Sequence, residues 1–140
     1  MPVTRTFKLA TALLCVGSLA AGCGGSGPPP IAIGTLSGKV LLSGQAPGGE
    51  CQVNFFDSVK GAGGLALTGA DGTFTASLPV TASGYKVSIT AKEPEPTEPG
   101  VPRPKTVSGI PPKFRSMDTS GLTAMVKEGP NDPITYDLTK

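Results

Sequence analysis

The stretch YKVSITA, residues 85–91, decides the fold class because its apolar and polar side chains alternate without a break. A period of two residues is that of an extended strand with one buried face. No stretch after residue 22 repeats with the period of a helix over a comparable length. The sequence therefore predicts an all-β fold. In this strand the apolar face carries Tyr85, Val87, Ile89 and Ala91, and the polar face carries Lys86, Ser88 and Thr90.

Six shorter stretches on either side show apolar alternation, and turn-forming Gly, Pro, Asn and Asp separate them. Each has an apolar face to bury, and seven such strands bury their faces most simply as two packed sheets. We therefore expect a seven-stranded β-sandwich. The apolar positions are Leu36, Val40 and Leu42; Cys51, Val53 and Phe55; Leu65 and Leu67; Phe74, Ala76 and Leu78; Leu122, Ala124 and Val126; and Ile134, Tyr136 and Leu138.

The sequence ADGT, residues 70–73, predicts a tight hairpin between the strand at 65–67 and the strand at 74–78. Asp71 and Gly72 both tolerate the positive φ that a type I′ turn requires at its two central residues. We therefore expect these two strands to be paired neighbours.

Residues 92–116 interrupt the strand pattern with seven prolines, which exclude a regular ladder. Acidic side chains lead the segment and basic side chains follow. A loop of this length inside a compact domain is either functional or a spacer. The sequence leaves both interpretations open. The charged residues are Glu93, Glu95 and Glu98, then Arg103, Lys105, Lys113 and Arg115.

Residues 1–22 have the parts of a secretory signal. Arg5 and Lys8 form its basic start, and they account for the net charge of +2 of the whole chain. The apolar stretch 9–19 is too short to span a bilayer, which needs about 20 residues. We therefore expect this leader to be cleaved.

The sequence LAAGC, residues 19–23, resembles the bacterial lipobox. The resemblance implies cleavage between Gly22 and Cys23 and acylation of the Cys23 thiol and amine. Cys15 fails as an alternative because the large Leu14 precedes it, whereas a plain secretory signal stays open. With Gly24 and not an aspartate after the cysteine, the outer membrane is favoured where the cell has one. Residues 23–34 then form a Gly- and Pro-rich tether.

Cys51 has no intramolecular partner once Cys15 is removed and Cys23 is lipidated. We expect it to pack as a small apolar side chain in a strand. A reactive thiol or an intermolecular disulfide is the alternative.

Three stretches, LSGKVLLSG (36–44), LTGADGTFTASLP (67–79) and GYKVSI (84–89), resemble the carboxypeptidase-regulatory-like, transthyretin-like domain. The tail from residue 110 is similar to that of small bacterial lipoproteins with one such domain, with Phe114 in the aromatic position. The resemblance covers residues 35–140. It implies a seven-stranded antiparallel Greek-key sandwich and no particular activity. The matching positions are Gly38, Val40, Thr68, Asp71, Gly72, Phe74, Gly84, Tyr85 and Val87.

Composition limits the function classes. Apart from the leader, acidic and basic residues balance, which argues against a nucleic-acid partner. The chain has no histidine, so histidine-dependent catalysis and zinc sites with histidine ligands are excluded. This includes the histidine site with which transthyretin-like enzymes hydrolyse 5-hydroxyisourate. The acidic residues lack the spacing of a calcium loop.

We therefore expect a membrane-anchored, non-catalytic binding or structural module of the cell envelope, without cofactor or metal. Its partner, a protein or a glycan, would bind the 92–116 loop or an exposed strand edge. The alternatives are calcium binding and, less favoured, hydrolysis.

Overall fold

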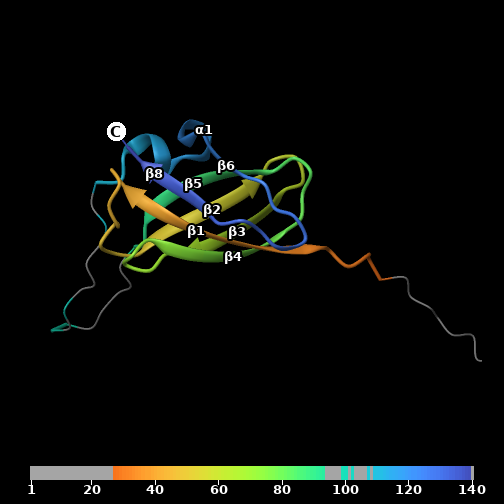
Figure 1. The fold of residues 1–140 in the computed structure, drawn as a ribbon, viewed down its shortest axis with the longest axis horizontal. Helices are drawn as coiled ribbons and strands as arrows, with labels where there is room; N and C mark the ends of the chain where they lie inside the picture. Colours follow the sequence, from red (N-terminus) through yellow and green to blue (C-terminus); the bar gives the residue numbers. More distant parts are fainter. Residues whose placement is uncertain (1–26, 94–98, 101, 103–106, 108, 140) are drawn as a thin grey trace, which may run out of the picture.

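The computed structural model describes residues 27–93, 99–100, 102, 107 and 109–139. They form two β-sheets that pack face to face, with two single-turn helices at one side (Figure 1). The elements are β1 (Ile33–Leu42), β2 (Cys51–Asp57), β3 (Ala62–Leu67), β4 (Thr73–Pro79), β5 (Tyr85–Ala91), the 3₁₀ helix η1 (Pro112–Arg115), α1 (Met117–Ser120), β6 (Leu122–Ala124), β7 (Gly129–Pro130) and β8 (Ile134–Leu138).

The second sheet has the order β3-β2-β5-β6, and all its neighbours are antiparallel. In the first sheet β1 is central, with β4 antiparallel on one side and β7 and β8 on the other. Both β7 and β8 run parallel to β1. The prediction of a wholly antiparallel sandwich is therefore wrong at β1. The reason is the path of the chain, which returns from β6 to pair Gly129 with Gly34 near the start of β1 and then follows β1 in the same direction.

The described residues contain eight strands, one more than the sequence predicts. The additional strand, β7, has two residues, too few for a period to be visible. The sequence also missed η1 and α1, because a helix of four residues is shorter than any helical repeat that a pattern can show.

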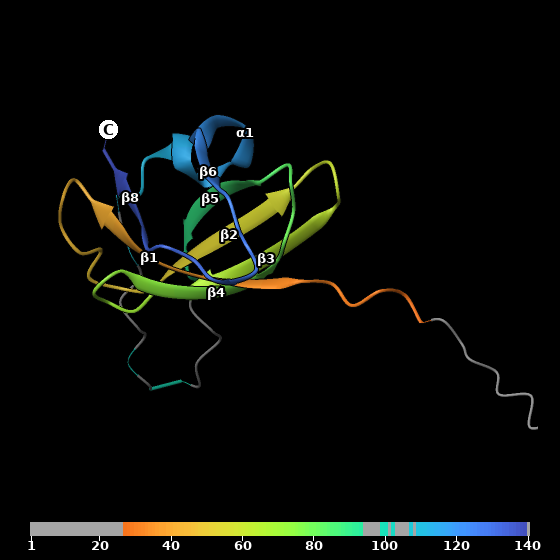
Figure 2. The ribbon, with the colours of Figure 1, turned by 45° about the vertical axis from the view of Figure 1, so that its right-hand side comes forward.

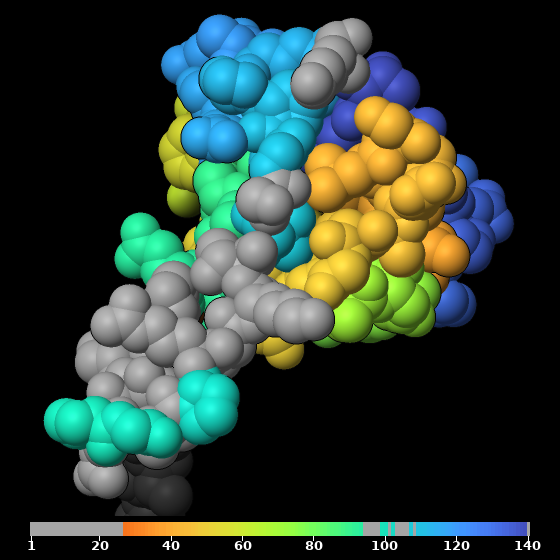
Figure 3. Space-filling model, turned by 90° about the vertical axis from the view of Figure 1, so that its left-hand side faces the viewer, coloured from red at the N-terminus to blue at the C-terminus, as the bar shows by residue number. Residues whose placement is uncertain are grey.

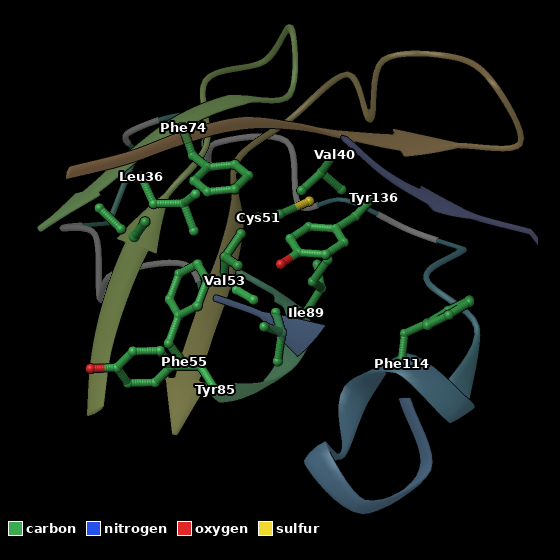
Figure 4. Close-up of a cluster of buried hydrophobic side chains, with 14 of the residues drawn as sticks. Leu36, Val40, Cys51, Val53, Phe55, Phe74, Tyr85, Ile89, Phe114 and Tyr136 are labelled. Atoms are coloured by element: carbon green, nitrogen blue, oxygen red, sulfur yellow. The ribbon is translucent and has the colours of Figure 1, made fainter. Parts of the chain in front are cut away.

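The core lies between the two sheets (Figure 4). The ring of Phe55 meets Phe74 at a centroid distance of 6.1 Å and Tyr85 at 6.3 Å, edge to face. Phe74 in turn stacks on Tyr136. Apart from the pair on β3, every apolar position predicted from the sequence is buried or packs against the core, so these positions are confirmed.

On β3 the predicted face is wrong. Leu65 and Leu67 are 53 % and 45 % exposed, and Ala66 between them is buried. The inner side of β3 has room only for small residues because Leu78 of β4 lies against it. A Cβ on Gly64 would stand 2.2 Å from Leu78 Cδ2. The leucines therefore lie on the outer face of the second sheet.

The turn at residues 69–73 does not join paired neighbours either. β3 pairs with β2, and β4 pairs with β1 in the other sheet. Within the turn, Gly72 N donates to Gly69 O, and Gly69 N donates to Thr73 O, both at 2.9 Å. Gly72 has a φ of 85°, whereas the only described non-glycine residue with a positive φ is Ser43. A type I′ turn is thereby excluded, and the pattern matches a turn followed by a glycine bulge.

The two ends of the sandwich differ in the segments of the chain that lie there. Residues 27–32 extend from the end where β1 begins, which we name the tether end (Figures 1 and 2). The opposite end, named the far end, holds the β1–β2 connection and the close of β8 (Figures 1 and 2).

Candidate functional site

The predicted lipidation site, Cys23, and the cleavage position at Gly22 lie outside the described residues, as does the leader 1–22. The described chain starts with Gly27 and is exposed up to Ile33. None of the helices in the described part of the chain has the length and apolar character needed to cross a membrane.

The motif residues on β1 and in the turn before β4 lie close together. Val40 N donates to Gly72 O at 2.9 Å. A Cβ on Gly72 would stand 2.1 Å from Val40 O, and a Cβ on Gly38 would stand 2.6 Å from the ring of Phe74. Both glycines therefore allow a close approach, of backbone in one case and of an aromatic ring in the other.

Asp71 binds its own turn. Its carboxylate accepts from Thr73 N at 3.1 Å and from Thr73 Oγ1 at 2.8 Å. These bonds, the backbone bond first, lower the pKa of Asp71. The carboxylate is thus engaged in shaping the turn.

Tyr85 and Gly84 form a corner before β5. The backbone partner expected for the Tyr85 hydroxyl is Pro79 O, to which it donates at 2.5 Å. Burial, and then the nearby charge of Asp57, raise the pKa of Tyr85. Gly84 has a φ of 75° and lies against Met125, where a Cβ would stand 2.6 Å from the sulfur. The corner joins β5 to the end of β4.

The sequence analysis missed Asp57, the most enclosed carboxylate among the described residues, with 2 % of its surface exposed. Its Oδ1 accepts from Val59 N at 2.8 Å and Lys60 N at 3.2 Å, and its Oδ2 accepts from Ser83 Oγ at 2.5 Å. The Ser83 bond is the main cause that lowers the pKa of Asp57. An aspartate four residues before Gly61 is a turn signal that could have indicated this position.

Thr81 completes the surroundings of Asp57. Its buried Oγ1 makes no hydrogen bond to any described residue. A cavity of about 380 Å³ opens beside this cluster at the tether end. The cluster ties the turn after β2 to the turn before β5. The cavity is lined by residues 56–59, 83–86 and 123–125.

The 92–116 segment carries the second candidate site. Lys92 Nζ forms an ion pair with Glu50 Oε2 at 2.7 Å. Val107, Ile110 and Phe114 are buried in the core cluster. The latter part of the segment is therefore packed onto the domain. Residues 94–98, 101, 103–106 and 108 lie outside the described residues, so the choice between spacer and binding loop is open for them.

A pocket of about 490 Å³ lies in this packed part, and we name it the proline pocket. Arg115 donates to Ile110 O through Nε at 3.0 Å and Nη2 at 2.7 Å. Lys113 Nζ lies 4.6 Å from the centroid of the Phe114 ring. The pocket thus has a mainly apolar lining, and two of its lining residues are basic. It is lined by Gly109, Ile110, Pro111, Pro112, Lys113 and Arg115.

The proline pocket belongs to the far end. Figure 3 faces this end and shows the segment from residue 109 onwards in cyan, beside the β1–β2 connection in orange and yellow. A ligand seated there would be on the opposite side of the sandwich from residues 27–32.

Cys51 packs as the sequence predicts. It is fully buried and forms no disulfide. Its backbone N donates to Thr68 Oγ1 at 2.8 Å. Burial raises the pKa of its thiol, which keeps it protonated and unreactive.

Comparisons with known proteins add no assignment: no family model, no curated protein and no solved structure matches the chain. Within the residues that the structure describes, no three Cys, Asp or Glu side chains come together as a metal site. The proline pocket and the free strand edges are therefore the features from which a function is argued.

Proposed function

We propose that this chain is a membrane-anchored lipoprotein of the bacterial envelope whose β-sandwich binds a protein or glycan partner without catalysis. The observation that carries the proposal is the separation of two features. Residues 27–32 leave from the tether end, and the proline pocket opens at the far end. An anchor at Cys23 would therefore leave the pocket facing away from the membrane.

The anchor is supported by the lipobox-like sequence at 19–23 and by the exposure of residues 27–33. Two or more acyl chains hold a protein stably in a bilayer, at about 0.8 kcal/mol for each buried CH₂. Acylation of Cys23 would thus fix the protein to the outer membrane, or to the single membrane of a cell that has only one.

Binding is supported by the chemistry of the proline pocket. Its lining is mainly apolar, and the guanidinium of Arg115 is held in place by two bonds to Ile110 O. These two bonds use the Nε edge of the guanidinium, and its terminal N–H groups can donate to a carboxylate. Lys113 adds a second cation nearby. The pocket therefore fits an extended partner with an acidic group, from an acidic protein segment or an acidic glycan.

We assign the sandwich to the transthyretin-like, Greek-key type. The chain crosses between the sheets from β1 to β2, from β3 to β4, from β4 to β5 and from β6 to β7, which supports this type. With β7 as the lead-in to β8, seven principal strands remain. This assignment concerns the fold and adds no activity.

The anchor is tested on a C-terminally tagged full chain expressed in a bacterial host. We expect mass spectrometry to find an N-terminal peptide that begins with acylated Cys23, in the membrane fraction. The control is Cys23→Ala, which should remain unprocessed and unacylated. Recovery of the unaltered chain as soluble, unacylated protein would disprove the anchor.

Binding is tested by crosslinking in intact cells, followed by pull-down and mass spectrometry. We expect a reproducible partner that is lost in Lys113→Glu, a change in the lining of the proline pocket. Lys127→Glu is the matched control, because Lys127 is exposed at the tether end beside Gly34. A partner that both variants retain would show that the pocket does not bind it.

A further inference from the structure

The outer edge of β3 is exposed in a way that natural strand edges rarely are. β3 pairs with β2 on one side, and no strand among the described residues pairs with its other side. Residues 61–70 contain no charged residue and no proline. Charges, prolines and bulges are the usual devices that keep an edge from pairing, and β3 has none of the first two.

The hydrogen bonds define which groups face outward. Thr68 N donates to Cys51 O at 2.9 Å, so residue 68 faces β2. In an antiparallel ladder, residues two apart direct their backbone groups to the same side. Ala62, Gly64 and Ala66 therefore also face β2. The N–H and C=O groups of Gly63, Leu65 and Leu67 face away from the sheet and have no strand to bind.

The edge of β4 is occupied by the protein itself at both of its ends. By the same parity, the residues that face outward on β4 are Thr73, Thr75, Ser77 and Pro79, since Val80 N donates to Ala32 O. The two at the ends, Thr73 and Pro79, are occupied, which leaves only the polar Thr75 and Ser77 between them. Thr73 N and Thr73 O are already bonded, to the Asp71 carboxylate and to Gly69 N. Pro79 has no N–H, and its carbonyl accepts from the Tyr85 hydroxyl.

The two other edges are also protected. β6 has three residues, and the carbonyl of Thr123 is taken by the hydroxyl of Tyr136 at 3.0 Å. On the edge of the first sheet, β8 carries Asp137, and Pro130 lies in β7. Among the described strands, β3 is thus the edge that is open along its whole length and carries large exposed apolar side chains.

We propose that β3 pairs with β3 of a second copy of this chain, antiparallel, about a two-fold axis through Leu65. In this register Leu65 faces Leu65 of the second copy, and Gly63 faces Leu67. Gly63, Leu65 and Leu67 then each form both of their outward backbone hydrogen bonds with the second copy. The sheets β3-β2-β5-β6 of the two copies join into one continuous sheet. The inference depends on the fold and not on the anchor.

The side chains fit this register. Leu65 and Leu67 are exposed on the outer face, and so is Phe56 at 40 %. Phe56 pairs with Gly63 and lies over it, with its Cδ2 3.6 Å from where a Cβ would stand. Leu67 of the second copy would lie on the other side of Gly63, where it can meet the Phe56 ring across the glycine. Cross-strand apolar pairs of this kind stabilise sheets.

The charges that flank β3 agree with an antiparallel partner. Lys60 precedes the strand, and Asp71 follows it in the next turn. Antiparallel pairing brings the Lys60 end of each copy beside the Asp71 end of the other. A parallel partner would set like charges together. The edge is therefore complementary to itself in charge as well as in hydrogen bonding.

The register is tested by disulfide crosslinking of the full chain in the cells that express it, whichever fraction holds it. Hydrogen-bonded partners have Cα atoms about 5.5 Å apart, which a disulfide spans. We expect Leu65→Cys to give a covalent dimer under a mild oxidant. Leu67→Cys is the matched control on the same strand, because its symmetry mate lies four residues along, about 13 Å away. Ser77→Cys is the control on the edge of β4.

Association itself is tested by sedimentation of the purified full chain in detergent over a range of concentrations. We expect a dimer that Leu65→Lys abolishes, because two lysines would face each other, and that Ser77→Lys retains. Leu65 is half exposed, so this variant keeps its fold, which circular dichroism would verify.

Four results would overturn the proposal. They are a monomer at every concentration, a dimer that Leu65→Lys leaves intact, equal crosslinking of Leu65→Cys and Leu67→Cys, and a Leu65→Cys product with a protein of different mass. The last would mean that β3 receives an extended segment of another protein.

Discussion

The two ends of the sandwich are stabilised by different kinds of interaction. At the tether end, hydrogen bonds from side chains join separate turns, with Asp57 bound to Ser83 and to the turn after β2 and Tyr85 bound to Pro79. At the far end, the turn at Gly72 fits against β1 backbone, and Phe114 inserts into the core. The tether end thus depends on side-chain hydrogen bonds that join separate turns. The far end depends mainly on close approach and burial, since the Asp71 carboxylate there binds only within its own turn.

This difference predicts which changes reduce the stability of each end. A hydrogen bond contributes about 1 kcal/mol net, whereas loss of a buried aromatic ring costs several times more. The far end should therefore respond most to changes of volume. The tether end should respond to changes of protonation, because it is built around a carboxylate.

The largest effect is expected for Phe114→Ala at the far end. The ring is buried with Val107 and Ile110, and removing it leaves a cavity. We expect a loss of about 3 kcal/mol in the free energy of unfolding, measured by urea titration. Lys113→Ala, the exposed neighbour, is the control and should change it by less than about 0.5 kcal/mol. A small effect of Phe114→Ala would mean that the segment is not part of the core.

Gly72→Ala should cost about 2 kcal/mol, since the new Cβ meets both a positive φ and the Val40 carbonyl. Gly44→Ala separates these causes. Gly44 has a similar φ of 78°, but nothing lies within 4 Å of its Cβ position. We expect urea titration to show a loss of only about 1 kcal/mol there. Equal losses in the two variants would show that the approach to β1 contributes nothing.

The sequence predicted those parts of the fold that depend on local alternation. The period of two along 85–91 gave a strand, and the apolar positions of six of the seven predicted strands lie in or against the core. Cys51 is buried among them, as expected of a small apolar residue.

The sequence predictions were wrong where the local structure depends on a part of the chain that is distant in sequence. The face of β3 is set by Leu78, which fills the inner side and leaves room only for Gly64 and Ala66. Leu65 and Leu67 therefore lie on the exposed outer face, although they are hydrophobic. The direction of β8 depends on where the chain returns beside Gly34, which no local pattern contains.

The candidate sites were predicted less well than the fold. The long segment at 92–116 was singled out by its prolines, but the sequence did not reveal that Phe114 packs into the core and frames a pocket. Asp57 was not singled out, because nothing in the sequence places Ser83 beside it. Cys23 stays a prediction.

At the tether end, Asp57→Asn should alter the response to acid more than the stability at neutral pH. An asparagine oxygen can still accept from Val59 N, and the Ser83 hydroxyl can turn to accept from the amide. The pKa of Asp57 is lowered by folding, chiefly by Ser83. Its contribution is therefore full above the ordinary carboxyl pKa of about 3.9 and is lost as the pH falls through the lower folded value.

We therefore expect the unaltered chain to lose stability below about pH 3.9, and Asp57→Asn to lose less over the same range. Urea titrations at several acidic pH values measure this slope. Ser83→Ala should also reduce the slope, and the double variant should add little to either single change because the two side chains act as one pair. If Asp57→Asn kept the full slope, other carboxylates would be responsible.

The smallest effect is expected for Glu50→Gln, a change of charge at the far end. Glu50 binds Lys92 at 2.7 Å, but their side chains are 52 % and 33 % exposed. Water screens a pair of this kind, so it contributes about 0.5 kcal/mol or less. Urea titration at low and high salt should therefore give nearly the same stability for Glu50→Gln and the unaltered chain. A loss that exceeds the effect of Gly44→Ala, and that salt removes, would show that charge also fastens the far end, and the contrast between the two ends would fail.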